Sequence, residues 1–267
     1  TKPKAVSNTG TNSLVTLSNF SDISNRTTFD ISFGSEFIDL IGNFSLGNPG
    51  ASFWLSSVNN ENEVVNFTHS YGAIIKFNSL GLINSLDPNS VPYSKPLTVG
   101  YDGKELMILS LYDTLKIFFI DGDFENSYSI YGDYLDRFWT SPVLYSQTNN
   151  NIEFLIGTEK GNIQKYSIDI SSKTSSQTES NQILTTPINQ IALIENGYNA
   201  IADQYYWSSN FAVNDSPINL GEKAFQLVNA KVGNEDVAII QTESRLISIS
   251  NTNEINEKHC CRSPYFL

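Results

Sequence analysis

Short apolar segments separated by polar turn residues run along most of this chain. Residues 106–109 and 154–156 are continuously apolar, whereas residues 163–166 alternate between apolar and polar side chains. Continuous short runs are typical of strands buried on both faces, and alternation is typical of strands buried on one face. No long segment has the apolar spacing and the end signals of an amphipathic helix. The pattern therefore predicts an all-β protein.

The strand-like segments recur in a constant order. Residues 96–120 contain a strand that begins at Pro96, a turn at Asp102 and Gly103, and two further strands; residues 142–166 repeat this order, with Pro142 located 46 positions after Pro96. Copies of the same template occupy residues 53–77, 187–207 and 225–249. Five copies spaced about 40–47 residues apart match the period of β-propeller blades.

The first fifty residues are less regular, with strand-like segments at 14–17, 28–33 and 37–41. We interpret them as a sixth, divergent blade, because a chain of 267 residues holds about six units of this period. The sequence thus predicts a single β-propeller domain of about six four-stranded blades at residues 1–255. Residues 256–267 are expected to form a C-terminal tail.

One repeat carries a family resemblance. Residues 141–145 (SPVLY) and 154–166 (FLIGTEKGNIQKY) resemble the blade repeat of PQQ-type and related quinoprotein-like propellers. In that repeat a small residue and a proline precede the innermost strand, an apolar strand ends in glycine, and an alternating strand ends in an aromatic residue. The resemblance implies a propeller architecture and says little about activity, because one fold supports many functions.

The signatures of several propeller families are missing from the sequence. PQQ enzymes have a tryptophan at a fixed place in every blade, whereas this chain has only Trp54, Trp139 and Trp207. The Trp-Asp ending of WD repeats, the Ser-x-Asp-x-Gly-x-Thr-Trp box of sialidases and the Asp-rich calcium loop of integrin-like repeats do not occur either.

The charge balance narrows the range of partners. The chain has 28 Asp and Glu against 16 Lys and Arg, for a net charge of −12. Nucleic acids and anionic membranes both require clustered cations, and no apolar run approaches the roughly 20 residues that cross a bilayer. We therefore expect neither a nucleic-acid partner nor direct membrane insertion. The acidic composition, rich in Asn, Ser and Thr, and the start at Thr1 instead of Met favour an exported or cell-envelope protein.

Residues with catalytic or metal-binding chemistry are sparse. His69 and His259 are the only histidines, so a Ser or Cys nucleophile has few bases available. His259 with Cys260 and Cys261 falls short of the four spaced ligands of a structural zinc site. Residues 121–126 (DGDFEN) lack the continuation of a calcium loop, and we interpret them as an exposed turn. We expect no enzymatic activity, no metal and no cofactor, although paired carboxylates of a glycosidase are visible only in three dimensions.

Two aromatic clusters are candidates for a binding surface, and packing between blades explains both equally well. Adjacent residues on a strand face opposite sides, so a run of consecutive aromatic residues is expected to expose at least one ring. We therefore predict the second cluster as the binding surface. The first cluster consists of Tyr128, Tyr131, Tyr134, Phe138 and Trp139, with Asp133, Asp136 and Arg137 among them; the second consists of Tyr205, Tyr206, Trp207 and Phe211.

These observations favour a non-enzymatic interaction or scaffold propeller whose loops bind a protein partner. Such a chain could also be one subunit of a larger surface or secretion assembly, which would require large obligate interfaces. The alternative is a carbohydrate-binding or carbohydrate-active propeller, which would use exposed aromatic rings and Asp or Glu side chains.

Overall fold

The structure is a computed structural model, and the chain divides into two compact units, Thr1–Ser45 and Leu46–Leu267. In the first unit, β1 (Val15–Ser18) pairs antiparallel with β2 (Asp30–Phe33). The sixth blade predicted for residues 1–50 falls mostly outside the described residues and stays a prediction. The described residues are 15–18, 30–33, 55–59, 64–70, 73–78, 81–86, 94–111, 113–120, 127–195, 197–210, 216–233, 235–250 and 254–259.

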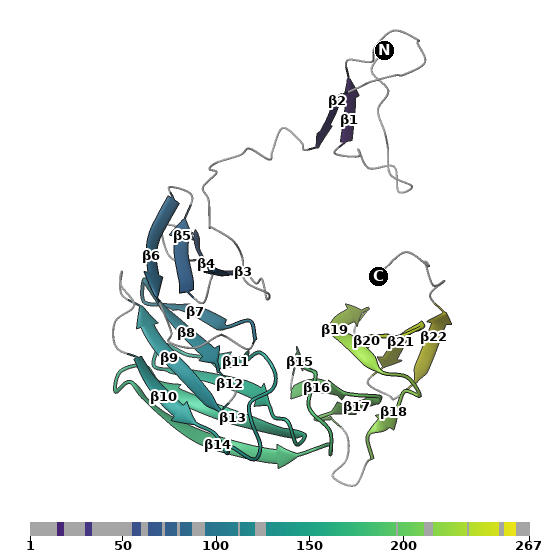
Figure 1. Ribbon diagram of the computed structural model, residues 1–267. Helices are drawn as coiled ribbons and strands as arrows, with labels where there is room; N and C mark the ends of the chain where they lie inside the picture. Colours follow the sequence, from purple (N-terminus) through teal and green to yellow (C-terminus); the bar gives the residue numbers. More distant parts are fainter. Residues whose placement is uncertain are drawn as a thin grey trace. The chain divides into compact units, whose positions relative to one another are not determined.

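The described part of the second unit contains five four-stranded antiparallel sheets, each made of strands that follow one another in the sequence (Figure 1). This arrangement confirms the predicted all-β propeller architecture, and we number the sheets as blades 1 to 5. Blade 1 comprises β3 (Leu55–Asn59), β4 (Val64–Ser70), β5 (Ala73–Asn78) and β6 (Gly81–Leu86); blade 2 comprises β7 (Leu97–Tyr101), β8 (Lys104–Ser110), β9 (Thr114–Ile120) and β10 (Ser127–Tyr131). Blade 3 comprises β11 (Val143–Gln147), β12 (Asn151–Gly157), β13 (Asn162–Asp169) and β14 (Thr174–Gln182); blade 4 comprises β15 (Gln190–Ile194), β16 (Gly197–Ala202), β17 (Tyr205–Ser208) and β18 (Ile218–Asn219); blade 5 comprises β19 (Ala224–Val232), β20 (Glu235–Thr242), β21 (Arg245–Ser250) and β22 (Ile255–His259).

The last blade extends beyond the end predicted for it. β22 pairs antiparallel with β21 along its whole length, from Ile255 opposite Ile249 to His259 opposite Arg245. The sheet therefore reaches His259, inside the segment that the sequence predicts as a tail. β22 has little apolar character because it is the outermost strand and its described side chains are exposed, so the hydrophobic pattern does not reveal it.

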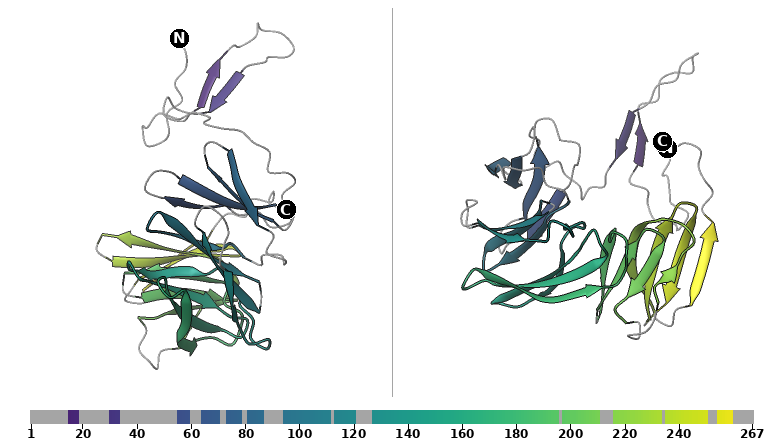
Figure 2. Two further views of the ribbon diagram at one scale, coloured as in Figure 1. Left: turned by 90° about the vertical axis from the view of Figure 1, so that its left-hand side faces the viewer. Right: turned by 60° about the horizontal axis from the view of Figure 1, so that its bottom comes forward.

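Neighbouring blades pack face to face, which explains the continuously apolar runs in the sequence (Figure 2). In β8, Leu106 and Ile108 belong to a core shared with blade 3, whereas Met107 and Leu109 belong to a core shared with blade 1. Because successive side chains of a strand point to opposite faces, a blade between two others must be apolar on both. The first strands of neighbouring blades also touch: β3 contacts β7, β11 contacts β15, and β15 contacts β19.

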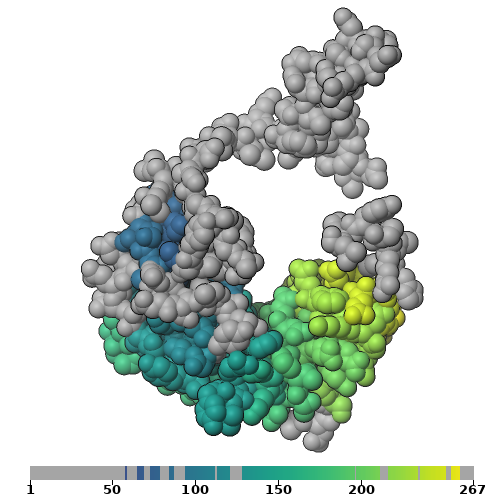
Figure 3. All heavy atoms as spheres, in the orientation of Figure 1, coloured from purple at the N-terminus to yellow at the C-terminus, as the bar shows by residue number. Residues whose placement is uncertain are grey.

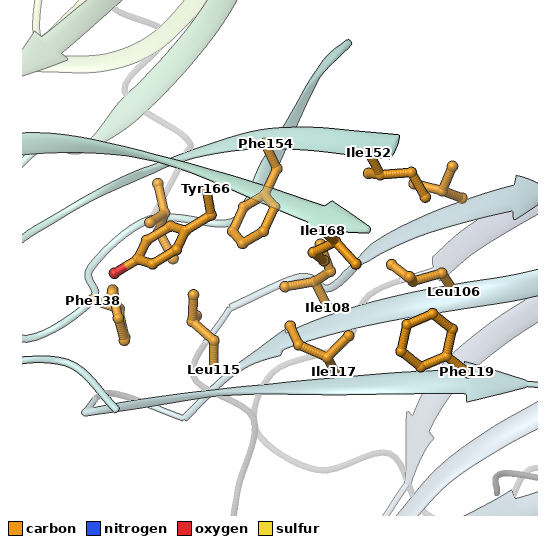
Figure 4. Close-up of a cluster of buried hydrophobic side chains, with 12 residues drawn as sticks. Leu106, Ile108, Leu115, Ile117, Phe119, Phe138, Ile152, Phe154, Tyr166 and Ile168 are labelled. Carbon is orange, nitrogen blue, oxygen red and sulfur yellow. The ribbon is translucent and has the colours of Figure 1, made fainter. Parts of the chain in front are cut away.

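The core between blades 2 and 3 is rich in aromatic rings (Figure 4). Phe154 stacks on Tyr166 with ring centroids 5.4 Å apart, and Phe138 meets the same tyrosine edge to face at 6.4 Å. Phe138 lies in the segment that joins the two blades, so this connector is held by the core itself. Full burial of such a side chain contributes about 1.5–3 kcal/mol to folding.

Contact between blades continues along the chain from blade 1 to blade 5. In the space-filling view, coloured atoms of successive blades meet from teal through green to yellow (Figure 3). A buried ion pair joins blades 1 and 2, where Nζ of Lys76 lies 2.9 Å from Oε2 of Glu105. Within the described residues, no helix has the length and hydropathy to cross a membrane.

Candidate functional site

The end of β10 and the connector between blades 2 and 3 that follows it present three large apolar side chains to solvent. Tyr131 is 79% exposed, Tyr134 is 77% exposed and Leu135 is 54% exposed. The two tyrosines are the most exposed large hydrophobic side chains in the described part of the chain. We call these three residues the aromatic surface. Clustered exposed apolar side chains on a soluble protein are typical of an interaction site.

A tight turn places two of these side chains outside the fold. The amide of Asp136 donates a hydrogen bond to the carbonyl of Asp133 at 2.9 Å, so Tyr134 and Leu135 occupy the two central positions of a β-turn. The amide of Leu135 also donates to Oδ1 of Asp133 at 2.8 Å. Aspartate favours the first position of such turns because its side chain accepts this bond.

The buried carboxylate of Asp136 ties this turn to blade 3. Its Oδ1 accepts a hydrogen bond from the amide of Lys160 at 2.8 Å, and its Oδ2 accepts one from Nδ2 of Asn162 at 2.5 Å. Both donors lie at the β12–β13 turn. Hydrogen bonds to an ionised acceptor are roughly twice as strong as neutral ones, so the connector is firmly attached at this point.

A second contact, more exposed than the first, also joins this connector to the β12–β13 turn. Nε and the NH2 group of Arg137 each donate to the carboxylate of Glu159 at 2.8 Å, and the Glu159 amide donates to the Arg137 carbonyl at 2.9 Å. The hydrogen bond from Arg137 lowers the pKa of Glu159 below its usual value. Both side chains are partly exposed, so solvent screens the pair and its main effect is to fix geometry.

Gly132 allows the chain to pass closely over the buried ring of Phe138. A Cβ atom at position 132 would lie 2.8 Å from the edge of that ring, which is closer than carbon atoms pack. The amide of Gly132 donates to the carbonyl of Asp113 at 2.7 Å. Each side of the aromatic surface is therefore anchored, by blade 2 at Asp113 and by blade 3 at Lys160.

Two carboxylates flank the aromatic surface. Asp113 and Asp133 are both exposed. Oδ1 of Asp113 accepts a hydrogen bond from the Thr114 hydroxyl at 3.0 Å, and Oδ1 of Asp133 accepts the Leu135 amide. In the described part of the chain no lysine or arginine forms an ion pair with either of them. The surface is thus both aromatic and acidic.

The structure places the residues of the predicted binding cluster in different environments. Tyr205, Tyr206 and Trp207 lie in β17, the third strand of blade 4, whereas Phe211 lies outside the described residues. Tyr206 is only 3% exposed, and this burial raises the pKa of its hydroxyl to about 12. Trp207 is half-buried and tilts against Tyr198 at 5.6 Å between ring centroids.

Tyr205 is the member of this cluster that lines a hollow. It is half-buried and lines a shallow hollow of about 460 Å³ together with Gln182, Thr185 and Pro217. The hollow lies beside the connector between blades 3 and 4. Ligand binding by the second cluster stays a prediction.

Other candidates from the sequence have less structural definition. His69 pairs with Ile74 across β4 and β5, but its side chain is outside the described part, as are Cys260 and Cys261. Among the described residues, no group of three His, Cys, Asp or Glu side chains is arranged to hold a metal ion. Residues 121–126 also lie outside; they follow β9, whose Phe119 lines a groove of about 900 Å³ between blades 2 and 3.

The sequence prediction named the residues of the aromatic surface only as part of the first cluster, or not at all in the case of Leu135. The sequence feature that distinguishes the aromatic surface from the rest of the first cluster is the turn that follows Tyr131. Tyr131 is followed by Gly132, and the next four residues begin and end with aspartate. Glycine and aspartate at these positions are typical of a turn, and an aromatic ring inside a turn, such as that of Tyr134, has no neighbouring strand to cover it.

Comparison with known proteins identifies the fold. No protein-family model matches the chain, and no curated protein is similar to it in sequence. The structure of BBS1N, solved in complex with ARL6DN, is similar with a TM-score of 0.56 and 7% identity, over 77% of this chain and 68% of that chain. Sqt1 from Saccharomyces cerevisiae is similar with a TM-score of 0.53 and 10% identity, over 83% of this chain and 67% of that one.

A third similar structure is Sqt1 from Chaetomium thermophilum, solved bound to the N-terminus of the ribosomal protein L10. Its TM-score is 0.56 at 8% identity, over 80% of this chain and 66% of that chain. The chain thus spans about two thirds of the length of these neighbours, which are β-propellers. Likeness at such low identity shows the fold alone, and on this evidence the chain is a β-propeller.

Proposed function

We propose that this chain is a non-enzymatic protein-interaction propeller, and that the aromatic surface contacts its partner. The observation that carries the proposal is the exposure of Tyr131 at the end of β10 and of Tyr134 in the connector that follows, which Asp136 and Phe138 hold in place. Tyrosine is enriched among the residues that dominate binding energy at protein interfaces. A surface already fixed in place loses little conformational entropy when a partner binds.

The structural neighbours support a protein as the partner class. BBS1N was solved in complex with ARL6DN, and the Chaetomium thermophilum Sqt1 was solved bound to the N-terminus of the ribosomal protein L10. Both are propellers that present a protein-binding surface on the same kind of scaffold. We extend this property to the present chain as part of the proposal, because the shared fold does not itself determine a partner.

The proposal also includes an exported or cell-envelope setting, a role as subunit of a larger surface or secretion assembly, and a quinoprotein-like origin of the blade repeat. The net charge of −12 and the polar composition support the setting. Fractionation of the source cells combined with protease treatment of intact cells tests it. Recovery of the chain only in a protease-protected cytosolic fraction would contradict this setting and leave the interaction proposal intact.

Site-specific cross-linking tests the interaction itself. A photo-reactive phenylalanine analogue at position 134 is expected to form a covalent adduct with the partner in the native source. The same analogue at position 232, where Val232 is 63% exposed at the end of β19, serves as the control. An adduct at position 134 and none at 232 is the expected result.

The partner identified in this way must then bind the purified chain. The double variant Tyr131→Ala/Tyr134→Ala is expected to weaken that binding by about a hundredfold, because each tyrosine supplies about 1–2 kcal/mol at an interface centre. Unchanged affinity of the double variant, or equal adducts at positions 134 and 232, would overturn the proposed function.

A carbohydrate-binding propeller is the second candidate, and the hollow beside Tyr205 is the observation that favours it. A half-buried ring next to the amide of Gln182 and the hydroxyl of Thr185 offers both an apolar face and hydrogen-bonding groups. Binding to a glycan array that is lost in Tyr205→Ala and kept in Tyr134→Ala would support this function. Absence of binding to any glycan would exclude it.

A further inference from the structure

We infer that the aromatic surface recognises a basic protein segment, in which a lysine or arginine lies next to an apolar residue. The inference rests on the proposed function and adds the chemistry of the partner. It follows from three features of the surface: its carboxylates without an ion-pair partner among the described residues, its exposed tyrosine rings and the exposed apolar side chain of Leu135 next to Tyr134.

The net charge around the aromatic surface is negative, since Asp113, Asp133, Asp136 and Glu159 outnumber Arg137 and Lys160. Arg137 is neutralised by its two hydrogen bonds to Glu159, and the charge of the exposed Lys160 is balanced by the carboxylate of Asp136, whose Oδ1 accepts the Lys160 amide. Asp113 and Asp133, in contrast, face solvent without an ion-pair partner among the described residues. A net charge of −12 over the whole chain adds a long-range attraction for a cationic partner.

Tyrosine rings beside carboxylates are suited to lysine and arginine. A cation over a ring face is attracted by the quadrupole of the ring, and a nearby carboxylate adds a charge-assisted hydrogen bond. Blade 3 contains the same arrangement internally: Nζ of Lys165 lies 4.3 Å from the ring centroid of Tyr145 and 3.5 Å from Oε2 of Glu153. A basic residue of the partner would make the corresponding contacts with Tyr131 or Tyr134.

Leu135 is the reason that the partner segment is expected to contain an apolar residue. Its side chain is 54% exposed at the second central position of the turn, directly beside Tyr134. An apolar residue adjacent to the cation would cover it and remove apolar area from water on both partners. A purely acidic segment would be repelled by Asp113 and Asp133, whereas a purely apolar segment would leave both carboxylates without a partner.

Binding of two synthetic peptides tests this inference. The first is a fluorescein-labelled 12-residue peptide of alternating Arg, Leu and Ser, and the second carries Glu in place of every Arg. Fluorescence anisotropy is measured with the full chain at 50 mM and 300 mM NaCl. The basic peptide is expected to bind more than about tenfold tighter than the acidic one, and to weaken at high salt because exposed charges are screened.

Matched variants locate the effect on the surface. Asp113→Asn/Asp133→Asn removes two charges while keeping the side-chain oxygen that accepts the Leu135 amide, and is expected to weaken binding about three- to tenfold. Glu235→Gln/Glu254→Gln removes two charges from exposed positions on blade 5 and is expected to change binding less than about twofold. Equal weakening by the two double variants would mean attraction by net charge alone, and would overturn the inference.

The natural partner separates this inference from the proposed function. If a partner cross-links at position 134 but binds independently of salt and of Asp113→Asn/Asp133→Asn, the inference fails and the proposed function stands. If the basic peptide binds as expected but Tyr131→Ala/Tyr134→Ala leaves its affinity unchanged, the aromatic surface is not the site and the inference fails as well.

Discussion

The two aromatic clusters of this chain have similar compositions, yet among the described residues only the first has rings that are largely exposed. In the first cluster, Tyr131 at the end of β10 and Tyr134 in the connector that follows it are 79% and 77% exposed. In the second, Tyr206 is buried and Trp207 is half-buried within a strand. The difference arises from where each cluster falls in a blade and not from the residues themselves.

A strand inside a blade has a neighbouring blade on each face. Tyr206 belongs to the core shared with blade 5, whereas Tyr205 and Trp207 pack against the core shared with blade 3. Alternation along β17 therefore sends successive rings to two covered faces. Tyr131 is the last residue of the outermost strand of blade 2, and Tyr134 lies in the connector that follows it. Among the described residues of this connector, Phe138 alone belongs to a core. Adjacent rings inside a strand thus indicate packing between blades, whereas rings at a strand end or in an anchored turn indicate a surface.

Removing a buried ring from either cluster is expected to have the largest effect. Phe138→Ala and Tyr206→Ala should each lower the free energy of unfolding by about 3–5 kcal/mol, because each leaves a cavity between two blades. Urea unfolding followed by tryptophan fluorescence measures the change. A loss below about 1 kcal/mol in either variant would show that the blades on its two sides are not packed as described.

Removing the anchor of the connector between blades 2 and 3 is expected to have an intermediate effect on the free energy of unfolding. Asp136→Ala removes the acceptor of the Lys160 amide and of Asn162, which should lower the free energy of unfolding by about 1.5–3 kcal/mol. The same variant should weaken partner binding, because the aromatic surface loses its fixed position. Asp133→Asn is the control for the stability measurement, since it keeps the acceptor of the Leu135 amide and should leave stability nearly unchanged.

Glu222 anchors the connector that leads into blade 5 in the same way as Asp136 anchors the connector between blades 2 and 3. The pKa of Glu222 is shifted, so its role as an anchor can be tested by varying the pH. It accepts hydrogen bonds from the Ser244 amide at 3.0 Å, the Ser244 hydroxyl at 2.6 Å and the Thr242 hydroxyl at 2.7 Å. These bonds, with a smaller contribution from Arg245, lower the pKa of Glu222 from 4.5 to about 2.

A lowered pKa in the folded state stabilises the protein above the unfolded-state value of 4.5, and this stability is lost as the pH falls toward about 2. Glu222→Gln should therefore flatten the decrease in unfolding free energy between these two pH values. Thermal unfolding measured at several acidic pH values checks this. An identical acid decrease in both proteins would contradict the role of Glu222 as the charged anchor of this connector.

The smallest effect on stability is expected for the exposed rings. Tyr131→Ala/Tyr134→Ala should change the free energy of unfolding by less than about 0.5 kcal/mol per residue, because neither ring contributes to a core. This variant is the one expected to lose partner binding most completely. A large loss of stability would show that these rings pack against the fold and would remove the contrast between the clusters.

The hydrophobic pattern predicted the inner three strands of each blade well and did not locate the outermost ones. β14 has the sequence TSSQTESNQ, and all but one of its residues are exposed. An edge strand of this kind is held by main-chain hydrogen bonds to β13 and by few apolar contacts. β22 is missed for the same reason. Such strands carry no apolar alternation, so only the four-stranded period of the fold implies them.

The candidate site was only partly predictable. The sequence brings Tyr131, Asp133, Tyr134 and Asp136 to notice as an aromatic and acidic segment. It does not show that Asp136 turns inward to Lys160 and Asn162 while Asp133 stays outside, because both donors lie more than twenty residues away in another blade. These long-range contacts hold part of the first cluster at the surface, and the sequence does not reveal them.

The sequence by itself determined the all-β class, the period of about 43 residues and the apolar strands that lie between blades. These features are local, since burial on one or both faces is recorded in the spacing of apolar residues. The tertiary structure alone decided which aromatic rings face solvent and which carboxylates are anchors. Those properties depend on the neighbouring blade, and the spacing of residues along one strand contains no information about what covers it.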